Sequence, residues 1–407
     1  MEKAKRILKP LGEVTEFMTK GIAPKYTENE TENTIKVLNQ RCNRNFQISY
    51  KEARLHDKSL RKVSEEKLLK PGDVLINSTG TGTAGRVAQV WQIPATTTFD
   101  GHMILLRPTK EIDPLYYGYA IKAQQKQIES LAEGSTGQTE INRKRLQEEI
   151  IINFPINISK QRKVGMILFN IDKRIKINAA INDNLQQQAQ ALYKSCFVDF
   201  DPYDGIMPSD WIIGTVDDLA KEIVCGKTPS TKISEYYGSE IPFITIPDMH
   251  GKIYVMTTER YLSMYGANSQ PKKTLPKNSI CVSCIGTAGL VSLVASESQT
   301  NQQINSIIPK DDYSPYYIYL LMRTLSEVIN KLGQGGSTIV NLNKAQFGKI
   351  QVMIPTVASM RKFDKTVSPL FSVILENQKE NIYLSSLRDT LLPRLMSGEL
   401  DVSDIQL

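Results

Sequence analysis

The first candidates for chemistry are a glycine-rich stretch and a cysteine pair. Residues 80–85, Gly-Thr-Gly-Thr-Ala-Gly, have the GxGxxG spacing that binds dinucleotide phosphates when a helix follows directly. Here the following residues, 86–93, are typical of a β-strand, so we predict a turn between two strands beside a ligand surface. Cys281-x-x-Cys284 is a lone pair whose counterparts in the first half of the chain are Ile76 and Thr79. We therefore favour two buried strand residues over a zinc or redox centre.

Other catalytic motifs are missing from the sequence. The three histidines, His56, His102 and His250, do not have the spacing of metal ligands. The chain lacks the GxxxxGK[ST] loop of ATPases, and it lacks the tetrapeptide beginning Asn-Pro-Pro of adenine methyltransferases. No nucleophile motif occurs in both halves. We predict a protein without catalytic residues and without a bound metal.

Both halves instead offer basic, aromatic and amide side chains in predicted loops. Lys and Arg neutralise phosphates, while Asn, Gln, Ser and Thr in loops can contact base edges. The alternative for any single charged residue is a merely solvated surface. The candidate DNA contacts are Lys20, Lys25, Tyr26, Arg41, Arg44, Arg86, Gln138, Thr139, Arg143, Lys144, Lys227, Thr228, Lys232, Tyr236, Tyr237, Lys272, Lys273, Gln302, Gln303, Ser337, Thr338 and Lys344.

Two long helices must position these loops. Residues 159–197 contain no proline and place apolar residues at alternating steps of four and three, which is the seam of a coiled coil. At about 1.5 Å per residue the helix would be roughly 58 Å long, so it needs a partner helix along most of its length. Residues 359–395 repeat the same seam 199 positions later, and Pro369 could restart or kink that second helix.

Asparagines interrupt both seams at the same two places, Asn178 and Asn182 in the first helix and Asn377 and Asn381 in the second. A buried Asn pair fixes the register of a coiled coil at some cost in stability. We predict an antiparallel helix pair in which Asn178 meets Asn381 and Asn182 meets Asn377. The alternative places these Asn in solvent and turns Ile177, Ile181 and Leu375 toward the partner helix.

The whole chain is two copies of one unit, because matching residues recur at a shift that drifts slowly from 205 to 199. The drift indicates small loop insertions within a duplicated fold. Each copy is a mostly-β globular unit with a helix near its end, predicted at 113–132 and 315–332, followed by one long helix. The matches include Gly21, Pro24, Thr83, Gly85, Tyr116, Tyr117 and Pro155 with Gly226, Pro229, Thr287, Gly289, Tyr316, Tyr317 and Pro355.

We therefore predict an α+β fold with internal pseudo-twofold symmetry, in which two mostly-β domains are separated by a pair of long antiparallel coiled-coil helices. The predicted boundaries are 1–156 for the first domain, 157–200 for a central helical region, 201–355 for the second domain and 356–407 for a C-terminal helical region. Residues 199–209, rich in Asp and Pro, form the linker between the first long helix and the second domain.

Composition sets outer limits on function. The net charge of +7 permits nucleic acid as a partner without requiring it. No apolar run approaches the roughly 18 residues of a membrane span. The N-terminal residues lack the apolar core of a signal peptide, and five scattered cysteines fit a reducing compartment. We expect a cytoplasmic protein without a membrane partner.

The chain resembles the specificity subunit of type I restriction–modification systems over nearly its whole length. Residues 168–197, LFNIDKRIKINAAINDNLQQQAQALYKSCF, are similar to the family's central region, and residues 387–400, LRDTLLPRLMSGEL, to its C-terminal region. Residues 226–229, GKTP, and 300–303, TNQQ, resemble recurring pieces of its target-recognition domains.

The resemblance implies a non-catalytic, DNA-binding subunit that reads a bipartite target, one half-site per domain. It implies that the helices set the length of the spacer and dock two modification subunits together with restriction and translocase subunits. S-adenosylmethionine and ATP with Mg²⁺ would then be bound by those partners, and this chain would hold no cofactor. The residues leave two other classes open. A self-sufficient methyltransferase or nuclease would need the missing motifs, and a coiled-coil structural adaptor would not read DNA.

Overall fold

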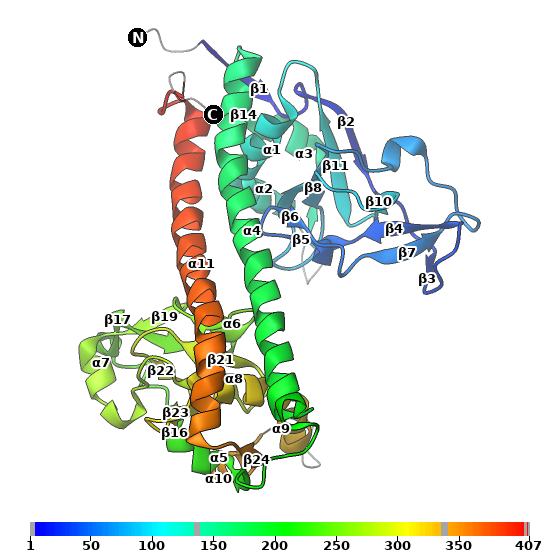
Figure 1. Ribbon diagram of the computed structural model, residues 1–407. Helices are drawn as coiled ribbons and strands as arrows, with labels where there is room; N and C mark the ends of the chain where they lie inside the picture. The colour runs from blue at the N-terminus through cyan, green and yellow to red at the C-terminus, as the bar shows by residue number, and fades with distance from the viewer. Residues whose placement is uncertain (1–4, 134–138, 335–340, 403–404, 406–407) are drawn as a thin grey trace. The chain divides into compact units, whose positions relative to one another are not determined.

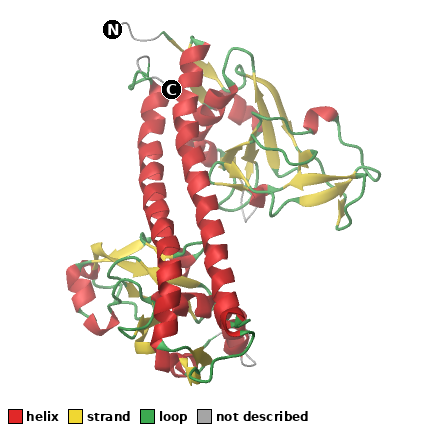
Figure 2. Ribbon diagram, in the orientation of Figure 1, coloured by secondary structure: helices red, strands yellow, loops and turns green. Residues whose placement is uncertain are grey.

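The computed structural model describes residues 5–133, 139–334, 341–402 and 405 (Figure 1). The chain forms two compact units: unit 1 comprises Met1–Arg174 with Tyr383–Leu407, and unit 2 comprises Ile175–Ile382. Each contains both helices and sheets (Figure 2), which confirms the α+β class. Within the described ranges, no helix combines the length and apolar character that crossing a membrane requires.

Unit 1 is built on an antiparallel sheet of order β2-β11-β8-β9 and a second sheet of order β10-β4-β7-β3. A separate strand pair, β1-β14, lies beside α1, and α2 and α3 complete the unit. The bounds are β1 Arg6–Pro10, β2 Thr15–Lys20, β3 Tyr26–Thr27, β4 Thr34–Leu38, β7 Arg54–Asp57, β8 Val74–Asn77, β9 Val87–Gln89, β10 Thr97–Phe99, β11 Met103–Pro108, α1 Pro114–Ala123, α2 Gln125–Ser130, α3 Arg143–Glu149 and β14 Ile151–Pro155; the short pairs are β5 Asn43–Arg44 with β6 Gln47–Ile48 and β12 Ala132–Glu133 with β13 Glu140–Ile141.

Unit 2 repeats this plan with the sheets β16-β23-β20-β21-β18 and β19-β17-β22 and the strand pair β15-β24. The bounds are β15 Ile212–Thr215, α5 Val216–Leu219, β16 Ala220–Cys225, β17 Tyr237–Ile244, α6 Ile246–Met249, β18 Tyr254–Val255, β19 Arg260–Leu262, α7 Met264–Asn268, β20 Ile280–Ser283, β21 Val291–Val294, β22 Gln299–Thr300, β23 Ile304–Pro309, α8 Pro315–Thr324, α9 Ser326–Gln334, α10 Lys344–Gly348 and β24 Gln351–Ile354.

The duplication predicted from the sequence is confirmed strand by strand. β2, β11, β8 and β9 correspond to β16, β23, β20 and β21, in the same order and with the same antiparallel pairing. Both second sheets contain one parallel contact, β10 with β4 in unit 1 and β22 with β17 in unit 2. β8 and β20 are buried along their whole length, and each consists of three apolar residues followed by one polar residue.

The sequence prediction for the helix after each sheet needs two corrections. The single helices predicted at 113–132 and 315–332 are each two helices, because Gln124 and Leu325 adopt φ near −90° and ψ near 0° and end the first of each pair. The residue match is also shifted by one. Tyr116 donates a hydrogen bond to the Asn153 carbonyl oxygen (2.7 Å), and its structural counterpart is Tyr317, which donates to the Met353 carbonyl oxygen (2.6 Å).

The long helices are α4, Ile158–Phe197, and α11, Val357–Ser397, each within two residues of its predicted bounds. α11 is continuous through Pro369, so the predicted restart is wrong. In unit 1 Leu168 of α4 and Leu392 and Leu395 of α11 belong to one buried cluster. Both helices contribute residues to both units.

The asparagine prediction is confirmed for the part of the seam in unit 2. Asn178 is fully buried and Asn182 is 6% exposed, whereas Ile177 and Ile181 are 42% and 40% exposed. The alternative with these isoleucines facing the partner is therefore wrong. Leu375 is nevertheless buried as well, because α11 turns two adjacent apolar residues, Ile374 and Leu375, inward.

The two asparagine pairs make the same hydrogen bonds in opposite senses. Asn178 Nδ2 donates to Asn381 Oδ1 (2.9 Å), and Asn381 Nδ2 donates to the carbonyl oxygen three residues before Asn178 (3.2 Å). Asn377 Nδ2 donates to Asn182 Oδ1 (2.9 Å), and Asn182 Nδ2 donates to the carbonyl oxygen three residues before Asn377 (3.3 Å). This pattern shows that the helices run antiparallel, and it repeats through the local pseudo-twofold.

Candidate nucleic-acid interface

In unit 1 backbone hydrogen bonds bring four turns together at one end of the main sheet. Ser78 N donates to the His102 carbonyl oxygen (2.8 Å), and Ile141 N donates to the Ser78 carbonyl oxygen (2.8 Å). Ile22 N donates to the Phe99 carbonyl oxygen (3.0 Å). We call these segments the turn cluster of unit 1: residues 20–24, 78–85, 99–102 and 139–144.

Unit 2 has the same cluster, formed by residues 225–229, 284–289, 300–303 and 341–344. Cys284 N donates to the Gln303 carbonyl oxygen (2.8 Å), and Leu342 N donates to the Cys284 carbonyl oxygen (2.9 Å). Lys227 N donates to the Thr300 carbonyl oxygen (2.9 Å). The GKTP and TNQQ segments, which lie more than 70 residues apart in the sequence, are therefore adjacent.

One glycine in each cluster makes this contact possible. A Cβ at Gly21 would lie 2.0 Å from the Asp100 carbonyl oxygen, and a Cβ at Gly226 would lie 2.1 Å from the Asn301 carbonyl oxygen. No residue with a side chain fits at either position without moving the backbone. The GxGxxG stretch is the turn between β8 and β9, which confirms the predicted turn between two strands.

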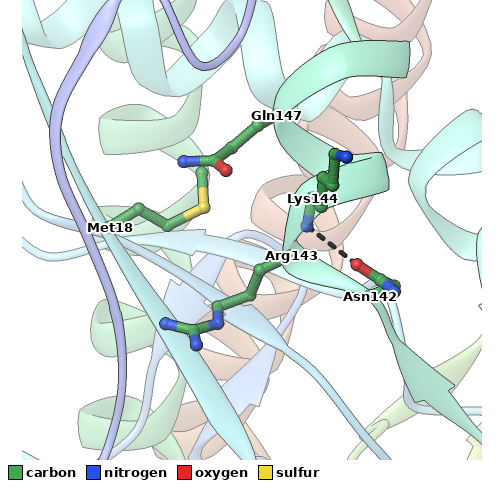
Figure 3. Close-up of a pocket in the computed structure, with 5 residues that line it drawn as sticks. All are labelled: Met18, Asn142, Arg143, Lys144 and Gln147. Atoms are coloured by element: carbon green, nitrogen blue, oxygen red, sulfur yellow. Dashed lines mark hydrogen bonds between the residues drawn. The ribbon is translucent and has the colours of Figure 1, made fainter.

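A pocket of about 400 Å³ adjoins the turn cluster of unit 1 (Figure 3). Met18 from β2 faces α3, which supplies Arg143, Lys144 and Gln147 to the pocket. Asn142 caps the helix by accepting from Lys144 N (2.8 Å). Arg143 also lines the neighbouring pocket. Among the described residues no ion pair involves the exposed Arg143 guanidinium, so it is a cation available to a phosphate.

The structure divides the predicted contacts of unit 1 into two groups. Lys20, Thr139, Arg143 and Lys144 lie in the turn cluster, although Lys20 is paired with Glu140 and Lys144 lies 3.9 Å from Glu148. The others flank the cluster: Lys25 and Tyr26 follow its first segment, and Arg86 donates to the Gly82 carbonyl oxygen (2.9 Å). Arg41 and Arg44 are both exposed, Arg44 in β5 and Arg41 shortly before it. Gln138 lies outside the described residues.

In unit 2 the turn cluster contains Lys227, Thr228, Gln302, Gln303 and Lys344. Thr228 Oγ1 donates to Gln302 Oε1 (2.8 Å), so these two side chains orient each other. The remaining candidates lie on the flanking segments: Lys232 and Lys272 are exposed, the Tyr236 ring packs against Tyr265, and Tyr237 donates to the Pro229 carbonyl oxygen (2.9 Å). Ser337 and Thr338 lie outside the described residues.

Lys273 has a structural contact that the sequence did not reveal. Its Nζ donates to the Cys225 carbonyl oxygen (2.8 Å) where β16 enters the turn cluster. In unit 1 Lys67 does the same, donating to the Gly21 carbonyl oxygen (3.3 Å) from an equivalent 3₁₀ turn. The Lys273 ammonium is therefore hydrogen-bonded within unit 2, whereas the Lys272 side chain is exposed.

This difference predicts distinct phenotypes for adjacent lysines. Lys272→Ala should weaken binding to all DNA sequences alike and reduce the slope of log K against log salt by about one, because one phosphate contact is lost. Lys273→Ala should instead lower the free energy of unfolding by roughly 1.5–3 kcal/mol, the usual contribution of a hydrogen bond to a charged group. Fluorescence anisotropy over a salt series and urea unfolding would measure both. A change of preferred bases without a change of salt slope in Lys272→Ala would contradict a phosphate contact.

Burial explains why the CxxC pair is not a reactive centre. Cys281 is fully buried in β20, and burial raises the pKa of its thiol to about 12. Burial likewise raises the pKa of the Cys284 thiol to about 11. Thiolates, the reactive and metal-binding form, are disfavoured at both positions. Over the described ranges, no group of His, Cys, Asp and Glu side chains is placed to hold a metal ion.

Two arginines that the sequence analysis did not single out occupy equivalent positions on the second sheets. Arg54 in β7 pairs with Val37 of β4, and Arg260 in β19 pairs with Phe243 of β17. Both are exposed. The two arginines are 206 residues apart, close to the shift of 205 that relates this part of the two halves, so the repeat in the sequence could have identified them.

Comparison with known proteins gives a family model and several relatives. The model described as "Type I restriction modification DNA specificity domain" matches twice, over residues 8–187 and 208–382. The chain is 36% identical to the type I restriction enzyme HindI specificity subunit of Haemophilus influenzae, in an alignment covering 59% of this chain and 67% of that protein. It is 32% identical to the MjaIX specificity subunit of Methanocaldococcus jannaschii, covering 43% and 41%.

A solved structure shares the fold. The crystal structure of the type I restriction–modification system S subunit from M. genitalium aligns with a TM-score of 0.62 and 17% sequence identity, covering 97% of each chain. At this identity the likeness concerns the arrangement of elements alone. The agreement extends over both units and both long helices, since almost the whole chain is aligned.

Proposed function

The chain belongs to the type I restriction modification DNA specificity family, whose members are non-catalytic subunits, and from this premise we propose that it reads a bipartite DNA target. Each unit would contact one half-site through its turn cluster. The observation that carries the proposal is the duplication of that cluster, with the same hydrogen bonds between its segments and exposed basic side chains in both copies. A protein with two related readers is suited to a target with two halves.

We propose that α4 and α11 set the spacer between the half-sites and dock the other subunits. Both helices are long and continuous and contribute to both units, so the distance between the readers would follow their length. Apolar side chains on these helices are exposed, including Ile177 (42%) and Ile382 (40%) in unit 2 and Tyr383 (66%) in unit 1. Exposed apolar side chains of this kind suit protein partners. Two modification subunits and the restriction and translocase subunits are the proposed occupants.

This division of labour places the chemistry in the partners. A modification subunit carrying S-adenosylmethionine would methylate adenine, and a translocase subunit would use ATP with Mg²⁺. Because a methyltransferase must turn its target base out of the stack, a separate reader can determine which base is offered. The present chain would hold no cofactor, and the complex would act in the cytoplasm, where its five free cysteines stay reduced.

Methylome sequencing of a host carrying this chain with its modification subunit tests the proposal. We expect methylated adenines within one bipartite motif of fixed spacer, and none in a host carrying either protein alone. Methylation by this chain alone would indicate an enzyme. Methylation that does not depend on the chain, together with no salt-dependent DNA binding by the purified complex, would indicate a coiled-coil adaptor without a role in readout.

A further inference from the structure

Arg54 and Arg260 occupy equivalent strand positions in the two units, and each lies near an aromatic ring, although the two rings come from different positions. Their strand registers are equivalent, since Val37 with Arg54 and Phe243 with Arg260 are both separated by 206 residues from their counterparts. Each guanidinium lies over an aromatic ring: Arg54 Cζ is 3.5 Å from the centroid of Tyr26, and Arg260 Cζ is 5.3 Å from the centroid of Phe243. A guanidinium near the face of an aromatic ring is attracted to the ring, and its five N–H donors leave several available for hydrogen bonds to a ligand.

Both arginines also lack an anionic partner. Within residues 5–133, 139–334 and 341–402, none of the ion pairs involves either guanidinium. Two other arginines, by contrast, do form ion pairs: Arg107 binds the Asp73 carboxylate (2.8 Å), and Arg388 binds the Asp172 carboxylate (2.8 Å). Both guanidinium groups are exposed and have no carboxylate partner among the described residues, so both are available to bind a ligand.

The strands that pair with β7 and β19 connect both arginines to the turn clusters. Tyr26 follows the first segment of the unit 1 cluster, and it lies close enough to the buried Asp100 of the third segment for the two side chains to interact. In unit 2, Phe243 is followed by Ile244, which pairs with Thr300 at the start of the TNQQ segment. Each arginine therefore stands beside the surface to which the proposed function assigns DNA contact.

We infer that Arg54 and Arg260 are base readers, each donating its N–H edge to the O6 and N7 atoms of one guanine in its own half-site. The planar fork of Arg matches this pair of acceptors and is the commonest specific contact in the major groove. A phosphate contact needs only charge, which exposed lysines supply, whereas a guanidinium oriented in advance by an aromatic ring suits an acceptor pair of fixed geometry. This inference rests on the proposed function and names the side chains that confer specificity within it.

The first consequence concerns the wild-type target. Each half-site should contain at least one G·C pair, and replacing it should reduce methylation by between about fivefold and 150-fold, the discrimination expected of one bidentate contact. A bipartite motif with a half-site made only of A·T pairs would overturn the inference while leaving the proposed function intact. Absence of any motif would instead overturn the proposed function.

Conservative substitutions distinguish a contact to a base from a contact to a phosphate. Arg54→Lys keeps the charge and loses the fork, so it should relax the first half-site at its G·C pair and leave the second half-site unchanged. Arg260→Lys should do the reverse. Tyr26→Phe keeps the ring and should keep the motif, whereas Tyr26→Leu removes the stacking surface and should relax the same base pair as Arg54→Lys. Arg361→Lys, at a surface arginine paired with Asp312, is the matched control and should leave the motif unaltered.

The experiment is methylome mapping of each variant with its modification subunit, together with anisotropy titrations over a salt series. Circular dichroism and urea unfolding establish that each variant is folded. An unchanged motif in Arg54→Lys and Arg260→Lys, with only a shallower salt slope in the alanine variants, would show that both are phosphate contacts. A change in both half-sites from one substitution would also overturn the inference.

Discussion

A variant with four residues added to each long helix, after Ala180 in α4 and after Gln378 in α11, should methylate a target whose spacer is one or two base pairs longer. The added residues lengthen each helix by about 6 Å at 1.5 Å per residue. DNA rises about 3.4 Å per base pair, so the gain corresponds to between one and two base pairs. Both half-sites should be unchanged, because the turn clusters are untouched.

The asparagine pairs determine where the insertions belong. Asn178 meets Asn381 and Asn182 meets Asn377, so the bond after Ala180 lies at the level of the bond after Gln378. Insertions at these two points separate the pairs from each other and leave the hydrogen bonds of each pair intact. Four residues are slightly more than one helical turn of about 3.6 residues, a change of phase that coiled coils accommodate by local unwinding.

Two outcomes of methylome mapping bear on this prediction. The control is a four-residue insertion in α4 alone, which shifts the register so that the two asparagine pairs cannot both form, and which should therefore reduce methylation at every target. An unchanged spacer in the double insertion would show that the helices do not set the distance. Altered half-sites would show that the units do not read DNA independently of the helices.

Replacing Arg388 by Ala should destabilise unit 1 by about 2–3 kcal/mol. Arg388 donates to Asp172 Oδ1 (2.8 Å) across the helix seam, and Tyr119 donates to Asp172 Oδ2 (2.7 Å). Without Arg388 the Asp172 carboxylate, only 13% exposed, would lose its ion-pair partner. Removing one partner of a fully buried pair costs about 3–5 kcal/mol, and we lower this figure because the pair is partly reached by solvent.

Unit 2 has an apolar residue pair at the positions equivalent to this ion pair. The residues 199 positions away from Asp172 and Arg388 are Phe371 and Ala189, and both are fully buried in the unit 2 core. The double variant Asp172→Phe/Arg388→Ala copies this apolar pair into unit 1. It should recover part of the stability lost by Arg388→Ala, because replacing a buried ion pair by apolar residues of suitable volume is often nearly neutral, whereas the Tyr119 hydroxyl loses its acceptor.

Urea unfolding followed by the fluorescence of Trp91 measures the change within unit 1. Trp91 packs against Phe169 of α4, at a centroid distance of 6.1 Å, and a Trp211→Phe background removes the signal of unit 2. A single variant as stable as the parent would show that the ion pair contributes nothing. A double variant less stable than Arg388→Ala would show that the apolar pair of unit 2 does not pack between the helices of unit 1.

The sequence alone determined the long helices, their seams, their asparagine pairs and the duplication of the chain. These features are periodic or repeated, and a helical seam depends only on the turn of one helix, so the positions of Asn178 and Asn377 predicted which residues would be buried. The turn after β8 could be predicted for a similar reason, since the residues that follow the glycines have strand character. The match was one position out of register at the tyrosines, where several similar residues are adjacent. It was also one position out at the cysteine pair, where Cys284 corresponds to Ser78 and not to Thr79.

Only the tertiary structure decided which polar side chains are available to a ligand. Lys272 and Lys273 are neighbours of the same type, yet one is exposed and the other donates to the Cys225 carbonyl oxygen from 48 residues away. Arg54 is distinguished by the Tyr26 ring beneath it, which belongs to another strand. The physical reason is that a charge is satisfied or free according to the acceptors and rings that distant segments bring within a few ångströms, and sequence spacing carries no record of that distance.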